Sequence, residues 1–289
     1  MAMVWRLFRK RRAVPALCLA IAAVAGSSQR TSPGEAQNAT PAASQADNAW
    51  LAKAAKLYFS TKAAGLEGFD CDVHPDWPAI FNSVSKGVPV ADNDARVLAL
   101  KPVRIAVHAR LGGGSTVDWV LPTAQDKPLD SDTSAMMEQV QKGIEQIVLG
   151  FLQFWTPFVD GSVIPASSEG VTVTRSPGQY MLHNHQNGTE LTEVFSSEMM
   201  LRHFNVMMGG TSIQFAPYYE QTDKGLLVNR FDALIQAAQS SAPAQEMHVK
   251  VDYAQIDGLP IPSRLNIEVV GTGTFNMALD GCQAIRVSK

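Results

Sequence analysis

Two histidines separated by a single residue, His183 and His185, are the side chains in this sequence best spaced to bind a metal. In a strand, residues two apart point to the same face, so the pair could hold zinc with a third ligand such as His203 or His248. Their neighbour Asn184 is polar as well, which indicates an ordinary solvated face beside a turn. We favour the solvated face and predict no metal site.

A second cluster of chemically capable side chains lies in the segment 70–77, DCDVHPDW, which contains Asp70, Asp72, His74 and Asp76. Carboxylates beside a histidine could carry out acid–base hydrolysis. Acidic residues that alternate along an edge strand more often form its solvated face. No G-x-S-x-G, H-E-x-x-H or C-x-x-C motif is present. We therefore predict no catalytic residue, no cofactor and no enzymatic activity, with a hydrolase as a minor alternative.

The elements that would position these residues begin with two helices. Residues 47–64 combine a capping Asp47 or Asn48 with an apolar face and predict one helix. Residues 134–158 predict a longer one with a polar opposite face. Its apolar positions recur at helical spacing and are Met137, Val140, Ile144, Ile147, Val148, Phe151, Trp155 and Phe158. This helix is expected to be the main filler of the interior.

Strands are predicted for most of the remaining chain. Alternating apolar and polar residues indicate strands at 69–74, 103–111 and 116–121. After Gly170, further strands are predicted at 171–175, 179–185, 189–195, 199–208, 212–221, 226–234, 247–255, 264–270 and 274–279. Turn sequences such as Asn187-Gly188 and Asp257-Gly258 separate neighbours. Short links of this kind join antiparallel strands, so we expect a meander.

The N-terminal residues have the composition of an export signal. Five basic residues between Arg6 and Arg12 precede the uncharged run 13–25, which ends in Ala-Val-Ala. We interpret 1–25 as a cleavable Sec-type signal peptide, 26–46 as a flexible tether and 47–289 as one domain. Cleavage would leave 19 basic against 27 acidic residues, a net charge of −8. An acidic chain of this kind is a poor ligand for nucleic acid, and the expected location is periplasmic or secreted.

Two cysteines remain after such cleavage, Cys71 and Cys282. An oxidising compartment favours a disulfide between them, although two unpaired buried thiols would also fit. The bridge would close a loop of about 210 residues, worth roughly 4–5 kcal/mol by the chain-entropy argument.

The C-terminal stretch 251–279, VDYAQIDGLPIPSRLNIEVVGTGTFNMAL, and the segment 193–215 resemble the closing strands and paired strands of the lipoprotein-carrier family. These are the LolA/LolB-like outer-membrane lipoprotein-sorting proteins. The resemblance implies an α+β fold in which a large curved antiparallel β-sheet, a half-barrel, is wrapped over helices. It also implies a cavity between sheet and helices that holds acyl chains.

The function expected from these features is a periplasmic carrier or binder of an apolar ligand, a lipid or an acylated protein. Burial of each acyl CH₂ contributes about 0.8 kcal/mol, and methionines suit irregular guests, although they equally serve as core filling. The residues expected to line the cavity are Val140, Ile144, Ile147, Phe151, Trp155, Met181, Met199 and Met207. The alternative is an envelope sensor that binds a membrane-protein partner through the same fold, as RseB-like sigma-factor regulators do.

Overall fold

A computed structural model of the chain describes residues 45–84, 89–121, 131–160, 164–165, 170–186, 188–237 and 243–287. The predicted signal peptide, 1–25, lies outside these residues, and so does all of the predicted tether except its last two positions. Both interpretations remain predictions.

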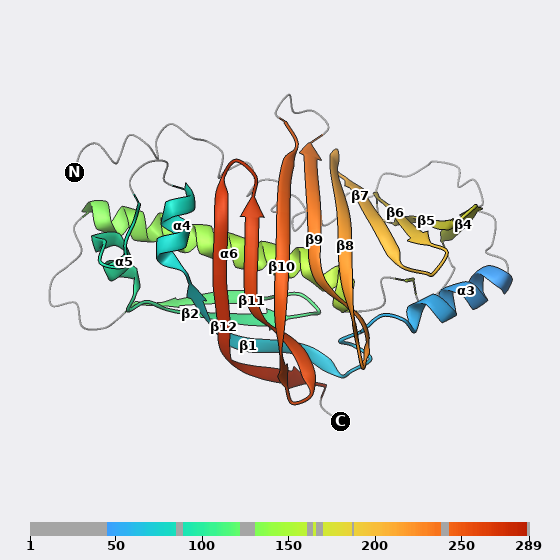
Figure 1. Cartoon of the computed structure of the whole chain (residues 1–289), viewed down its shortest axis with the longest axis horizontal. Coiled ribbons are helices and arrows are strands. Elements are labelled where there is room, and N and C mark those ends of the chain that lie inside the picture. Colours follow the sequence, from blue (N-terminus) through green and yellow to red (C-terminus); the bar gives the residue numbers. More distant parts are fainter. Residues whose placement is uncertain are drawn as a thin grey trace. The chain divides into compact units, whose positions relative to one another are not determined.

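The described residues form four helices and twelve strands (Figure 1). The helices are α3 (Gln45–Ala55), α4 (Trp77–Val84), α5 (Ala95–Leu100) and α6 (Ser131–Val159). The strands are β1 (Leu66–Pro75), β2 (Arg104–Arg110), β3 (Thr116–Val120), β4 (Val171–Ser176), β5 (Gln179–Gln186), β6 (Thr189–Ser196), β7 (Leu201–Met208), β8 (Thr211–Thr222), β9 (Gly225–Ala237), β10 (Gln245–Ile256), β11 (Leu259–Val269) and β12 (Gly273–Arg286).

Each predicted strand is confirmed, with ends that differ by up to seven residues, and α6 confirms the long helix. The prediction of one helix over 47–64 is wrong, because α3 ends at Ala55. The chain beyond it forms a parallel bridge in which Leu57 O accepts from Leu226 N at 2.7 Å and Phe59 N donates to Leu226 O at 2.9 Å. These tertiary hydrogen bonds replace those that a continuing helix would make. Helix α5 was not predicted; the Asp94 side chain caps it by accepting from Arg96 N.

The structure contains one open antiparallel sheet of twelve strands, not a closed barrel. Its residues fall into two compact units: unit 1 contains the described residues of 45–59 and 164–247, and unit 2 those of 60–160 and 248–287. The strand order in unit 1 is β9-β8-β7-β6-β5-β4, the predicted meander. In unit 2 the order is β3-β2-β1-β12-β11-β10.

Helix α6 covers the apolar face of the sheet in unit 2, and Figure 1 shows it running across β10–β12. The fully buried Trp155 contacts the ring of Phe69 in β1, with centroids 6.2 Å apart, and donates from Nε1 to Tyr253 Oη of β10 at 2.8 Å. This contact explains why a polar aromatic residue is tolerated there, since a buried indole N–H needs an acceptor. None of the helices in the described ranges is both long and apolar enough to cross a membrane.

Strand β1 joins the early and late parts of unit 2 because it pairs with both β2 and β12. A Cβ at Gly68 would lie 2.1 Å from Ala109 O of β2, so only glycine permits this approach. The predicted disulfide is confirmed: Cys71 of β1 is bonded to Cys282 of β12, 211 residues later. It fixes the C-terminal strand to the start of the domain.

Replacing both cysteines by serine is expected to lower the free energy of unfolding by about 3–5 kcal/mol, because the unfolded chain is no longer closed into a long loop. Denaturation in urea measures the change. A reductant should cause the same loss of unfolding free energy in the natural protein and should not change the stability of the double variant. Equal stability of the two proteins would contradict the expectation.

Candidate functional site

The pairing register of unit 1 assigns each side chain of β4–β9 to one of two faces. One row runs across the strands through Leu182, Glu193, Phe204, Phe215 and Ala233, which are direct cross-strand partners. The next row on the same side is Asn184, Leu191, Val206, Ile213 and Ile235. Most of these residues are apolar and half-buried or buried. We call this side the inner face of unit 1.

Helix α3 packs on one end of the inner face. Its Trp50 stacks on Tyr180 with ring centroids 4.4 Å apart and meets the edge of Phe195 at 5.5 Å. Asp47 Oδ1 accepts from Arg175 of β4 at 2.6 Å, and Arg175 lies over the ring of Tyr180. The apolar side of α3 is therefore held in place by aromatic packing and one ion pair.

Two of the methionines predicted to line a cavity lie on the opposite, outer face. Met181 pairs with Val194, and Met207 pairs with Glu190 and Ser212. Met207 is exposed, at 36% of its surface. A strand residue and its neighbour point to opposite faces, so Met207 points away from the face that carries Val206. The amino-acid composition alone does not show on which face of its strand a methionine lies.

The histidine pair shares this outer face, as the solvated-face interpretation predicted. His183 Nδ1 lies 3.2 Å from Thr192 Oγ1 and His185 lies 3.9 Å from Glu190, and both histidines are exposed. The hairpin predicted beside them is confirmed by the Gln186–Thr189 pair and a φ of 76° at Gly188. Among the described residues, no group of three or more His, Cys, Asp or Glu side chains is placed to hold a metal ion.

Met199, the third predicted methionine, occupies the turn between β6 and β7 with a φ of 64°. This left-handed conformation costs a residue with a Cβ about 1–2 kcal/mol. Tyr58 holds the turn: its hydroxyl donates to Met199 O at 2.7 Å and accepts from Leu201 N at 2.7 Å. Burial raises the pKa of Tyr58 to about 12, against the lowering effect of the Leu201 hydrogen bond.

One ionisable residue of the inner face, Glu193 of β6, was missed by sequence reasoning. Its exposure is 5%, and its direct cross-strand partners are Leu182 and Phe204. Within the described part of the chain no cation pairs with it and no donor hydrogen-bonds its carboxyl group. Burial therefore raises its pKa from 4.5 to about 8, so the carboxyl group is mostly protonated at neutral pH.

Glu193 lies close enough to Tyr58 and Tyr219 for its charge to act on both. The rings of the two tyrosines meet edge to face, with centroids 5.2 Å apart. Burial raises the pKa of Tyr219 well above its ordinary value, and the neighbouring charges of Tyr58 and Glu193 add to this effect. The three residues come from the segment after α3, from β6 and from β8, which only the tertiary fold brings together.

Three other buried polar atoms of unit 1 have no hydrogen-bond partner. Within the described ranges they are Trp50 Nε1, Asn184 Oδ1 and Tyr219 Oη. Leaving such a group unsatisfied costs about 1–3 kcal/mol, and native proteins contain few of them. Asn184 and Tyr219 lie on the inner face with Glu193, and Trp50 of α3 packs against the same face.

Half-buried apolar side chains continue the inner face beyond Glu193. They are Leu191, Phe204, Val206 and Met208. Phe204 and Met208 are four residues apart on β7, which spans roughly 13 Å along the strand. Small-molecule sites in proteins are lined mostly by apolar side chains with a few polar groups, so this surface is the candidate site of unit 1. We call Glu193, Tyr219 and these four residues the inner-face site.

The remaining predicted cavity residues lie on α6 in unit 2. Ile144, Phe151 and Trp155 are buried, whereas Val140 and Ile147 are half-buried. Phe151 and Trp155 stack with ring centroids 5.8 Å apart. The residues on α6 thus fill the interior as expected, and their contact with a ligand remains a prediction.

The acidic segment 70–77 forms a solvated network on the outer face of unit 2. His108 Nδ1 lies 2.9 Å from Asp70 Oδ1 and its Nε2 lies 3.3 Å from Asp118. Burial opposes a lower pKa at Asp70, but hydrogen bonds from Arg110 and His108 hold the pKa of Asp70 below its ordinary value.

Of the other three candidates of this segment, Asp76 Oδ1 accepts from Ala79 N of α4 at 3.0 Å, and the remaining two are engaged in exposed ion pairs. Asp72 lies 3.7 Å from Arg104, and His74 lies 3.0 Å from Asp280. The carboxylates and histidines are therefore engaged in ion pairs and hydrogen bonds on an open surface, with arginines among their partners, which favours the solvated-face interpretation of this segment.

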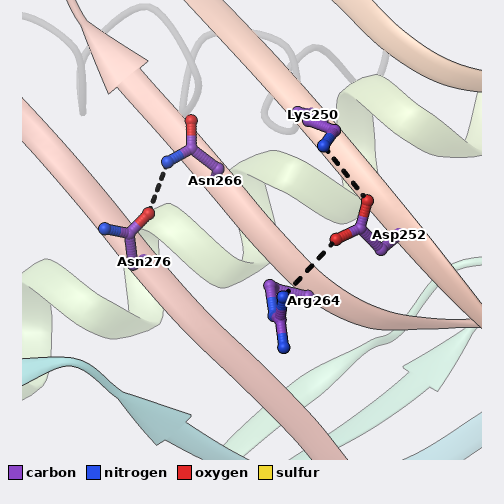
Figure 2. A pocket seen from close by; sticks show the side chains of 5 residues that line it. All are labelled: Lys250, Asp252, Arg264, Asn266 and Asn276. Carbon is purple, nitrogen blue, oxygen red and sulfur yellow. Dashed lines mark hydrogen bonds and ion pairs between the residues drawn. The ribbon is translucent and has the colours of Figure 1, made fainter.

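A shallow hollow of about 240 Å³ lies on the outer face of β10–β12 (Figure 2). Figure 2 shows Lys250, Asp252, Arg264, Asn266 and Asn276 standing on the side of the strands away from α6. Lys250 Nζ lies 3.5 Å from Asp252, Arg264 lies 4.0 Å from the same carboxylate, and the two asparagines are hydrogen-bonded to each other. The hollow is smaller than ligand pockets usually are, and its polar groups are already paired.

No known protein family and no curated protein sequence matches this chain.

Glu193→Gln is expected to remove a pH dependence from stability. The folded state keeps a proton that the unfolded state releases between pH 4.5 and about 8. Stability of the natural protein is therefore highest below this window and falls through it by up to about 1.4 kcal/mol per pH unit. The variant should be of similar stability at pH 5 and more stable than the natural protein at pH 9.

Urea denaturation at pH 5, 7 and 9 measures this difference. Glu190→Gln is the matched control, because Glu190 lies on the exposed outer face of the same strand. It should follow the natural protein at each pH. If Glu193→Gln also follows the natural protein at each pH, the carboxyl group is not desolvated in solution.

Proposed function

We propose that this protein is a non-enzymatic carrier or binder of an apolar ligand, an acyl chain supplied by a lipid or by an acylated protein. The single observation that carries this proposal is the inner-face site. Its four half-buried apolar side chains adjoin buried polar groups that have no partner within the described residues.

The energetics of an acyl guest suit such a surface. Burial of each CH₂ group contributes about 0.8 kcal/mol, so a chain lying over the rows of Leu191 and Phe204 gains affinity without any charged anchor. Val206 and Met208 extend the apolar strip along β7. The absence of a paired acid, base and nucleophile on this face, within the described ranges, favours binding over chemistry.

The setting that we propose is the periplasm or the extracellular space. The basic cluster and apolar run of 1–25 have the pattern of a Sec-type signal. The Cys71–Cys282 disulfide supports an oxidising compartment, since such bonds are rare in the cytosol. Under this proposal the sheet is the half-barrel of a LolA/LolB-like carrier, with helices over its concave face. Mass spectrometry of the exported protein should find an N-terminus at Gly26.

Uptake of the apolar fluorophore N-phenyl-1-naphthylamine tests the binding site. Val206→Trp should weaken uptake at least about tenfold, because the indole fills the space over the inner face and removes contact area worth 1.4 kcal/mol or more. Competition with a diacyl phospholipid and with a palmitoylated peptide then identifies the source of the acyl chain.

Met207→Trp is the matched control, because the next residue of β7 points to the outer face. It adds the same indole and should leave uptake unchanged. Both variants are first shown to unfold at the same urea concentration as the natural protein. No uptake by the natural protein, or equal loss in both variants, would remove the proposal.

A further inference from the structure

The hydrogen-bonding capacity of the inner-face site is unbalanced. When Glu193 is ionised, its carboxylate and Asn184 Oδ1 only accept hydrogen bonds, Tyr219 Oη both donates and accepts, and Trp50 Nε1 only donates. Asn184 faces Leu191 across β5 and β6, so it is a diagonal neighbour of Glu193, at roughly 7 Å. With Glu193 ionised, acceptors therefore outnumber donors around it, and a ligand rich in N–H donors would satisfy them.

Within the described residues, the surroundings of Glu193 also lack a positive charge that could pair with its carboxylate. The titratable groups that face it are Tyr58 from the segment after α3 and Tyr219 from β8. Arg202 of β7 acts on Tyr58, but its side chain is exposed and forms no ion pair with Glu193. A carboxyl group in this position gains from a ligand that brings a positive charge into the site, because the interaction of opposite charges is strongest where water is excluded.

Resting on the proposed function, we infer that the inner-face site binds a long-chain primary amine, with its ammonium group on Glu193 and Tyr219 and its alkyl chain along Phe204 and Val206. A primary ammonium carries three N–H donors and so matches the acceptors of the site. An anionic head group would meet a second negative charge or require Glu193 to remain protonated. A neutral alcohol would leave most of the acceptors unsatisfied.

Binding of the amine involves a defined proton movement. At neutral pH Glu193 is mostly protonated, because burial raises its pKa to about 8. The ammonium ion displaces this proton to solvent and pairs with the carboxylate. The affinity for the amine should therefore rise up to tenfold for each pH unit between 6 and 8 and then level off.

A series of C12 probes tests this inference by displacement of N-phenyl-1-naphthylamine below their micelle-forming concentrations. At pH 8 the natural protein should bind dodecylamine about 30-fold or more tightly than dodecanol, as expected for a desolvated charge pair. Dodecyltrimethylammonium, which has the charge but no N–H donor, should bind less tightly than dodecylamine. Dodecanoate should bind least well.

Two variants separate the roles of the acceptors. Glu193→Gln should remove the preference for dodecylamine and its pH dependence, while the affinity for dodecanol stays within about threefold. Tyr219→Phe removes a hydroxyl that lacks a partner in the free protein, so it should leave stability unchanged or higher. It should weaken binding of dodecylamine and leave binding of dodecyltrimethylammonium unaffected.

The outcomes distinguish this inference from the function on which it rests. If dodecanol displaces the fluorophore but dodecylamine gains no advantage, or if dodecanoate binds most tightly, the ammonium assignment is wrong and the apolar site stands. If no C12 probe binds, the proposed function fails first. An amine preference that persists in Glu193→Gln would also overturn the assignment.

Discussion

In an antiparallel sheet, successive side chains point to opposite faces, and the candidate site of this protein depends on that alternation. In unit 1 the pairing register places Leu182, Glu193, Phe204 and Phe215 in one row and continues the same side through Val206. A slip of one residue would exchange this face for the one that carries Met207. The apolar face, its buried carboxyl group and the exposed histidines opposite them are thus consequences of one register.

Under the proposed function, the buried carboxyl group lowers the stability of the folded protein but is the group that a ligand would bind. A leucine at Glu193 would complete the apolar row, whereas the glutamate is nearly inaccessible to water and has no paired cation within the described residues. The cost of burying this unpaired carboxyl group arises next to two tyrosines, Tyr58 and Tyr219. The hydroxyl group of Tyr219 also has no hydrogen-bond partner in the described part of the chain. Tyr58 differs, because its hydroxyl holds the strained turn at Met199. In this unit a tyrosine hydroxyl that is needed for the fold, that of Tyr58, thus lies near one that has no partner among the described residues, that of Tyr219.

Sequence patterns predicted the strands, the long helix and the disulfide because each leaves a local or compositional signal. Alternation over Arg104–Arg110 gives strand β2 with a solvated face, and the apolar stripe through Ile144 and Phe151 gives α6. Sequence patterns failed to predict the end of α3, which is Ala55 rather than residue 64. There the chain leaves the helix to make backbone hydrogen bonds with Leu226, which lies in a strand far along the sequence.

The sequence by itself determined which segments are strands and which residues could be reactive, but not which face of β5 or β7 packs inward. It did not determine which faces of different strands coincide, since that requires the register between segments. For this reason the methionines of β5 and β7, predicted to line a cavity, lie on the outer face. From the sequence alone, Glu193 cannot be distinguished from an ordinary charged residue on the exposed face of a strand. Only the tertiary structure places it among apolar neighbours, beside Tyr58 and Tyr219, where loss of water raises its pKa to about 8.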